Sequence, residues 1–168
     1  EIDKGRGSGN DLISRVLYSA MERLGTLRIA DLRGGQFDNV ICTRCDAVAA
    51  VPAGKAEDFA AFIREFDGIL KNEYALTCAA ADADAAYSAE DSSRLLHVLL
   101  TLPQGVEVMS ADFPGLVQTS LNLGVMTACG DGLHFSFSIR SSVATQKELL
   151  LQRVRSIVEY TGGGTVST

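Results

Sequence analysis

Four stretches of the chain carry apolar residues at the three- and four-residue spacing of a helix, so each is apolar on one face only. The first lies between the possible caps Ser8 and Asn10 and a stop at Gly25, with apolar residues Leu12, Ile13, Val16, Leu17, Ala20, Met21 and Leu24. The others are Lys55–Asn72, Ala89–Leu102 behind the cap Ser88, and a helix with capping-box spacing at Thr145–Glu148 that ends at Gly162–Gly164. Helices of this kind need an apolar surface to cover.

Segments with strand character fill the intervals between these helices. Thr26–Leu32 and Asn39–Val51 predict a first hairpin, with a turn region at Gly34-Gly35. Single strands are predicted at Leu76–Ala85 and Val106–Ser110. Thr119–Ala128 and Leu133–Ser141 predict a second hairpin through Cys129-Gly-Asp-Gly132, because Asp and Gly tolerate positive φ.

Each half of the chain therefore repeats the order helix, hairpin, helix. We expect an α+β fold in which two ferredoxin-like units, residues 1–85 and 86–168, share one mostly antiparallel sheet of six to eight strands. Four helices on one face of that sheet is the simplest packing, and it leaves the other face free. A chain of 168 residues with 46% hydrophobic residues is large enough to bury such a core.

Charge and hydropathy exclude several classes of partner. The net charge of −6, with Lys and Arg scattered along the chain, argues against nucleic-acid binding. No apolar run approaches the roughly 20 residues of a membrane helix. The chain starts Glu-Ile-Asp-Lys without Met or a signal-peptide pattern, so we expect a piece of a longer protein. The cysteines at 42, 45, 78 and 129 are not needed as bridges at this size, which favours reduced thiols in the cytoplasm.

The second predicted hairpin carries the first candidate site. In Leu133–Arg140 apolar and polar residues alternate strictly, so His134, Ser136, Ser138 and Arg140 share one face of the strand. Polar residues on an uncovered face are usually only solvated. The sharper interpretation is an anion site, because the planar fork of the Arg140 guanidinium suits a carboxylate.

Other chemical motifs are weak. Cys42-Thr-Arg-Cys45 has the spacing of a redox pair or half a zinc site, but no second pair of ligands follows, which favours structural thiols. His97 and His134 have no acidic residue at metal-site spacing, and the glycines lack a nucleotide-binding pattern. We therefore predict no metal site and no catalytic residue within this chain.

The order of five segments resembles the lid, or dimerisation domain, of aminoacyl-histidine dipeptidases. These carnosinase-like zinc metallopeptidases are also called peptidase D or cytosol non-specific dipeptidases. The segments are Glu1–Asn10, Asp31-Leu-Arg-Gly-Gly-Gln-Phe-Asp-Asn39-Val-Ile, Leu102-Pro-Gln-Gly-Val, Thr119-Ser-Leu-Asn-Leu-Gly-Val and Ser138-Ile-Arg140-Ser-Ser. In that family the lid interrupts a catalytic domain that holds two zinc ions.

The resemblance implies a function for the longer protein and roles for two residues here. It implies hydrolysis of Xaa-His or other dipeptides with a free C-terminal carboxylate, in the cytoplasm, with zinc bound by the parent catalytic domain and a possible homodimer. Asn39 and Arg140 match positions at which the family holds the substrate carboxylate. By the same resemblance, this segment alone is expected to be inactive.

Two other functions remain open from the sequence. The lid of a related deacylase or carboxypeptidase would keep the same carboxylate clamp. A free-standing ferredoxin-like regulatory or assembly module would have no catalytic domain around it.

Overall fold

The computed structural model of the 168-residue chain describes residues 7–70, 74–129 and 132–168. Its elements follow in the order α1 (Gly9–Leu24), β1 (Arg28–Gly34), β2 (Cys45–Ala50), α2 (Ala56–Ile69), α3 (Ala89–Thr101), β3 (Gly105–Met109), β4 (Val117–Cys129), β5 (Gly132–Ser141) and α4 (Ala144–Thr161). The predicted α+β class with an antiparallel sheet is confirmed. The sheet has five strands within the described residues, fewer than the six to eight predicted.

Strand β4 is the centre of the sheet. One of its edges pairs with β5 over nearly its whole length, from Thr119 opposite Ser141 to Cys129 opposite Gly132. The other strands follow the order β2-β1-β4-β3, and every pairing is antiparallel. Strands β1 and β4 meet at one residue pair, Gly34 and Met126, so β1–β2 and β3–β4–β5 form two blocks with little ladder between them.

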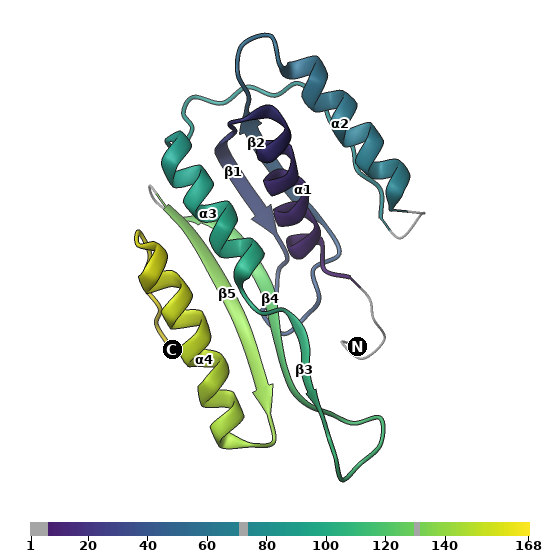
Figure 1. Ribbon diagram of the computed structural model, residues 1–168, viewed down its shortest axis with the longest axis vertical. Helices are drawn as coiled ribbons and strands as arrows, with labels where there is room; N and C mark the ends of the chain where they lie inside the picture. The colour runs from purple at the N-terminus through teal and green to yellow at the C-terminus, as the bar shows by residue number, and fades with distance from the viewer. Residues whose placement is uncertain (1–6, 71–73, 130–131) are drawn as a thin grey trace.

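The helices cover one face of the sheet. In Figure 1, α1 and α3 lie across β1, β2 and β4, α4 lies along β5, and α2 lies outside α1. The main core contains buried residues from α1, β1, α2, α3 and β4, among them Val16, Ile29, Phe62, Leu96 and Met126. A second cluster joins α4 to β4 through Leu121, Leu150 and Val154. None of the helices in the described part of the chain has the length and apolar character needed to cross a membrane.

Two of the predicted helix ends are confirmed in detail. The Ser88 hydroxyl accepts a hydrogen bond from the Asp91 amide at 2.9 Å, which caps α3. Gly25 ends α1 with a φ of 83°, and its amide donates to the Met21 carbonyl oxygen at 2.9 Å. A left-handed backbone conformation at this position favours glycine, because a Cβ atom would crowd the backbone.

Two other predicted caps are wrong. Helix α4 begins at Ala144, so Thr145 lies inside it and the capping box does not form. The Ser141 hydroxyl instead accepts from the Val143 amide at 3.0 Å, which starts the helix earlier. Asn10 lies inside α1 and uses its side chain for a contact with β4, while Ser8, at the N-cap position, makes no side-chain cap bond.

Two predicted strands are also corrected. Only Cys45–Ala50 of the expected Asn39–Val51 strand is paired, because residues 35–44 form a loop that is held against β4. The expected strand Leu76–Ala85 is not present, which fits the low strand propensity of its Ala and Asp residues. The predicted turn residues 130–131 and the predicted helical residues 71–72 lie outside the described residues.

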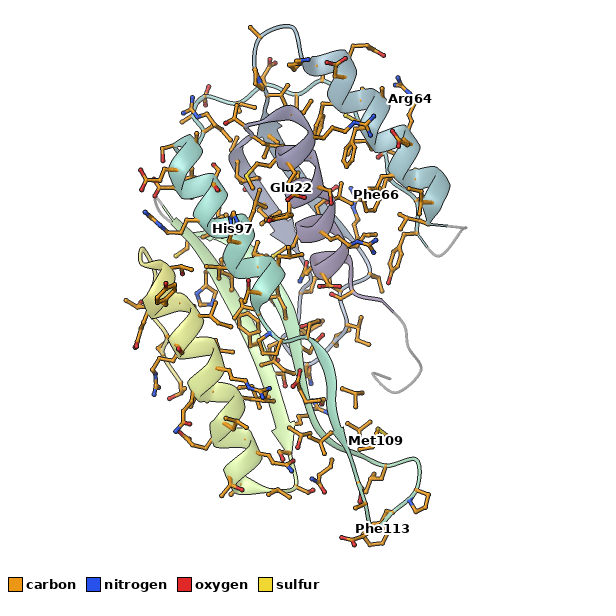
Figure 2. The ribbon with its side chains drawn as sticks, viewed as in Figure 1. Glu22, Arg64, Phe66, His97, Met109 and Phe113 are labelled. Atoms are coloured by element: carbon orange, nitrogen blue, oxygen red, sulfur yellow. The ribbon has the colours of Figure 1, made fainter. Side chains whose placement is uncertain are left out.

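Exposed apolar residues gather at the connection between β3 and β4. Met109, Phe113 and Leu116 are exposed there, and Figure 2 shows Met109 and Phe113 at the end of the molecule farthest from α2. This connection extends beyond the area that the helices cover, so it takes no part in the core.

A buried serine ties α3 to β1. The Ser92 hydroxyl, 0% exposed, accepts a hydrogen bond from the Ile29 amide at 2.9 Å. The Ile29 carbonyl oxygen accepts from the Tyr87 amide at 2.8 Å. Ser92 and Tyr87, from the second half of the chain, thus pair the backbone amide and carbonyl groups of Ile29. At this end of β1, β4 is not close enough to pair with it.

Replacement of Ser92 by alanine should destabilise the fold, because it leaves the buried Ile29 amide without an acceptor. We expect the free energy of unfolding to fall by about 1 to 3 kcal/mol in urea denaturation. Ser93→Ala is the matched control, since the Ser93 hydroxyl makes only a 3.5 Å contact with His97. An equal effect of the two substitutions would contradict the proposed link between α3 and β1.

Candidate functional site

The face of β4 and β5 opposite the helices is polar. Phe135, Phe137 and Ile139 of β5 pack into the two cores, as the alternation predicted. The alternate residues pair across the ladder with β4: Ser138 lies opposite Asn122, and Arg140 lies opposite Ser120. Residues directly opposite in an antiparallel pair share a face, so these four side chains all project away from the helices.

Arg140 is exposed on this face at the end of β5. Its guanidinium makes no ion pair with any acidic side chain in residues 7–70, 74–129 or 132–168. Six of the other nine arginines in these ranges are ion-paired, for example Arg94 with both Glu90 and Asp91. The fork of donors on Arg140 is therefore available to an anion.

Asn39 lies in the loop between β1 and β2 and is also exposed. The carbonyl oxygens of its two neighbours, Asp38 and Val40, accept hydrogen bonds from the side-chain amide of Asn122 at 2.8 and 3.0 Å. Asn122 is two residues from Ser120 along β4, a rise of about 7 Å. The residues that flank Asn39 thus contact β4 at Asn122, and Arg140 lies opposite Ser120 of the same strand, so Asn39 and Arg140 are on the same side of the sheet.

Sequence reasoning assigned no role to Asn122. Asparagine is uncommon inside a strand, and glycine inside a strand is a sign of a bulge or of a close backbone approach. The segment Asn122-Leu-Gly124 contains both signals, and the register of β4 with β5 shifts between Leu123 and Val125. These signals marked the position where the loop meets the sheet.

The cysteine motif has the character of structural thiols, with Cys42 buried and Cys45 partly buried. Cys42 is buried and its thiol donates to the Arg44 carbonyl oxygen at 3.0 Å. Burial is the main cause that raises the pKa of both thiols, to about 12 for Cys45. Cys42 lies in the loop and not on a strand as expected, but the conclusion that the thiols are structural agrees with their burial.

The two histidines have separate surroundings. His97 on α3 packs edge-on against Tyr18 of α1, with ring centroids 5.1 Å apart, and its Nδ1 lies 2.8 Å from the Ser93 carbonyl oxygen. His134 is exposed opposite Thr127 on the polar face. In the described part of the chain, no three His, Cys, Asp or Glu side chains group closely enough to hold a metal ion.

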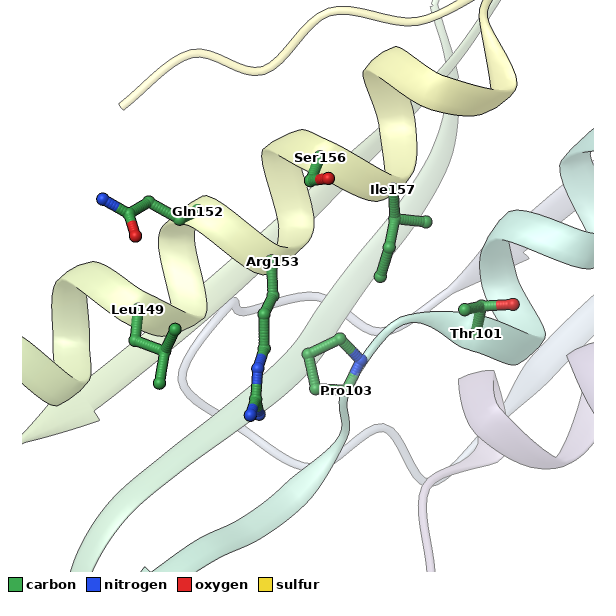
Figure 3. A pocket seen from close by; sticks show the side chains of 7 residues that line it. All are labelled: Thr101, Pro103, Leu149, Gln152, Arg153, Ser156 and Ile157. Carbon is green, nitrogen blue, oxygen red and sulfur yellow. The ribbon is translucent and has the colours of Figure 1, made fainter.

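A shallow groove of about 420 Å³ lies on the helix side, between the end of α3 and α4. Figure 3 shows its lining, which comprises Thr101, Pro103, Leu149, Gln152, Arg153, Ser156 and Ile157. Arg153 already contacts Glu107 at 3.1 Å. The groove lies on the face of the sheet opposite Arg140, so it is separate from the candidate site.

Comparisons with known proteins agree with this architecture. Residues 3–78 match the family of peptidase dimerisation domains. The chain is 31% identical to the cytosol non-specific dipeptidase of Escherichia coli K12 over 98% of its own length and 36% of that protein. Its fold matches the crystal structure of an aminoacylhistidine dipeptidase from Vibrio alginolyticus with a TM-score of 0.78 and 28% identity, over 94% of this chain and 34% of that one.

The mixed fold agrees with the match of residues 3–78 to a peptidase dimerisation domain. The resemblance to the dimerisation domain of peptidase D-like proteins, which the order of the segments predicted, is therefore confirmed as a similarity in sequence and in fold. It spans about a third of the length of each of the two relatives.

The burial of the cysteines leads to a labelling prediction. At pH 8 under native conditions, a thiol reagent should modify the exposed Cys78 and Cys129 quickly, and Cys42 and Cys45 slowly. The thiolate is the reactive form, and a thiol with a pKa of about 12 is ionised to only about one part in 10,000 at this pH. Mass spectrometry after timed alkylation checks this, with urea-unfolded protein as the control in which all four react. Rapid native labelling of Cys45 would contradict its partly buried position and raised pKa.

Proposed function

We propose that this chain is the lid of a zinc-dependent dipeptidase that hydrolyses Xaa-His or other free dipeptides, and that Arg140 and Asn39 bind the C-terminal carboxylate of the substrate. The observation that carries the proposal is the unpaired Arg140 guanidinium on the same uncovered face as Asn39. The dipeptidase names of the two relatives support the substrate class. We also propose that the lid consists of two units, residues 1–85 and residues 86–168.

The two side chains suit a carboxylate for different reasons. Arg140 supplies charge and two parallel donors, which match the two carboxylate oxygens. Asn39 supplies a neutral amide donor from another element. Together they hold one end of a dipeptide in a defined orientation, so the peptide bond lies at a set distance from the clamp. This distance is a physical basis for selecting dipeptides over longer peptides.

The reacting groups of the enzyme belong elsewhere in this proposal. The described residues of this chain offer no cluster of metal ligands, so they do not fit the two zinc ions of the family. We assign the zinc ions and the catalytic groups to segments of the longer protein outside this chain. The lid contributes substrate binding and, as its family name indicates, dimer contacts. The proposed location is the cytoplasm, with neither nucleic acid nor membrane as partner.

Arg140→Ala in the full-length protein should reduce kcat/KM for dipeptides by the equivalent of about 2 to 4 kcal/mol, because a desolvated carboxylate loses its charged partner. Arg140→Lys should give a smaller loss, since it keeps the charge without the fork. The measurement is hydrolysis of carnosine and other free dipeptides by the zinc-loaded protein.

Arg64→Ala is the control for that experiment, because Arg64 is exposed on α2 and pairs only with Glu57 in the described residues. Unchanged kcat/KM in Arg140→Ala would remove Arg140 from the site. A wild-type protein that cleaves N-acyl amino acids or longer peptides and leaves dipeptides intact would favour a deacylase or carboxypeptidase. A protein that cleaves none of these substrates would favour a regulatory module.

A further inference from the structure

Among the residues that the structure describes, the Asn122 side chain supplies the hydrogen bonds that attach the loop carrying Asn39 to β4. Asn122 is 7% exposed, and both carbonyl oxygens that flank Asn39 accept from its Nδ2. An amide nitrogen has two hydrogens, so these two bonds use its full capacity as a donor. In residues 36–41, the other backbone bond within the described chain is a 3.3 Å contact from the Val40 amide to the Phe37 carbonyl oxygen. Asn122 therefore holds the Asp38–Asn39 peptide unit, directly before Asn39, and the Val40–Ile41 peptide unit, one residue beyond it.

Two glycines allow the loop to lie directly on β4. A Cβ on Gly124 would collide with the backbone of Asp38, and a Cβ on Gly35 would collide with the Gly124 carbonyl oxygen. Backbone atoms cannot turn aside as a flexible side chain can, so both positions require glycine. Gly124 lies at the register shift of β4, where a bulge leaves space for the loop.

The segment of β4 that holds the loop is itself firmly bonded. It lies between the β3 pairing, which ends at Leu121, and the β1 pairing at Met126. In this gap the Leu123 amide donates to the Gln104 side-chain oxygen at 2.7 Å. The Leu123 carbonyl oxygen accepts from Asn10 at 2.9 Å. Side chains thus replace the missing strand, and Asn122 projects from a fixed backbone.

We propose that Asn122 is a positioning residue that sets the orientation of Asn39 toward the substrate carboxylate. This inference rests on the proposed role of Asn39 in the lid. Asn122 does not touch the substrate in this scheme. It holds the carbonyl groups of the residues before and after Asn39, so the Asn39 amide is oriented before substrate arrives and little entropy is lost on binding.

The test compares Asn122→Asp, Asn39→Ala and the double variant in the full-length zinc-loaded protein. Aspartate has nearly the same size as asparagine, but it cannot donate to the two carbonyl oxygens and repels them. Each protein is assayed with a dipeptide and with the same dipeptide as its C-terminal amide. The ratio of the two kcat/KM values measures how well the enzyme recognises the carboxylate.

We expect Asn122→Asp to lower that ratio by about tenfold, through KM, and to have little further effect in the Asn39→Ala background. A residue that only stabilised the fold would reduce the active fraction for both substrates equally and would leave the ratio unchanged. Gln152→Glu on α4 is the control for an amide-to-acid change on the opposite side of the sheet, and its ratio should equal that of the wild type.

The outcomes separate this inference from the proposed function. If Asn39→Ala lowers the ratio and Asn122→Asp does not, or if the two effects simply add, the positioning role is wrong and the role of Asn39 stands. If Asn39→Ala leaves the ratio unchanged, the proposed role of Asn39 fails, and the positioning role fails with it. If Asn122→Asp does not fold, Asn122→Ser is the second variant, because its hydroxyl keeps one donor. We expect it to lower the ratio as well, but by less than tenfold.

Discussion

Three strands pair with β4, and two of them, β1 and β3, share one of its edges. Neither reaches the backbone of Leu123, which lies in the gap between them. A strand in the middle of a sheet cannot leave buried amide and carbonyl groups unpaired, because each would lose its bonds with water without replacement. Asn10 and Gln104 fill the gap with side-chain bonds. The positions of α1 and of the segment before β3 depend on this requirement.

This arrangement separates packing from chemistry. The helices and their apolar contacts occupy one face of the sheet, and the residues that could bind an anion occupy the other. The candidate site draws on both halves of the chain, since Asn39 comes from the β1–β2 loop and Arg140 from β5. A site shared in this way requires that the block β1–β2 and the block β3–β4–β5 keep a fixed position relative to each other. The Gly34–Met126 pair and the bond between Ile29 and Ser92 supply it.

Sequence reasoning succeeded where the signal was local and regular. The alternation in Leu133–Arg140 placed Arg140 on the face away from the core, and the Ser88 cap and the Gly25 stop agree with the structure. It was wrong where a distant contact competed with a local pattern. Residues 39–44 have strand character but form a loop, because Asn122 and the bulge at Gly124 hold this segment against β4. Asn10 was expected as a cap for α1 and instead bonds to β4.

Residue spacing was sufficient for the helices, for the second hairpin and for the polar character of its outer face, since each of these depends on residues a few positions apart. The order of the motifs was sufficient for the resemblance to a peptidase lid. The path of residues 35–44 and the placement of Asn39 beside β4 depended on the folded chain. The bond from Asn122 to Asp38 spans 84 residues, and no local pattern specifies which side chain will satisfy a carbonyl group so far away.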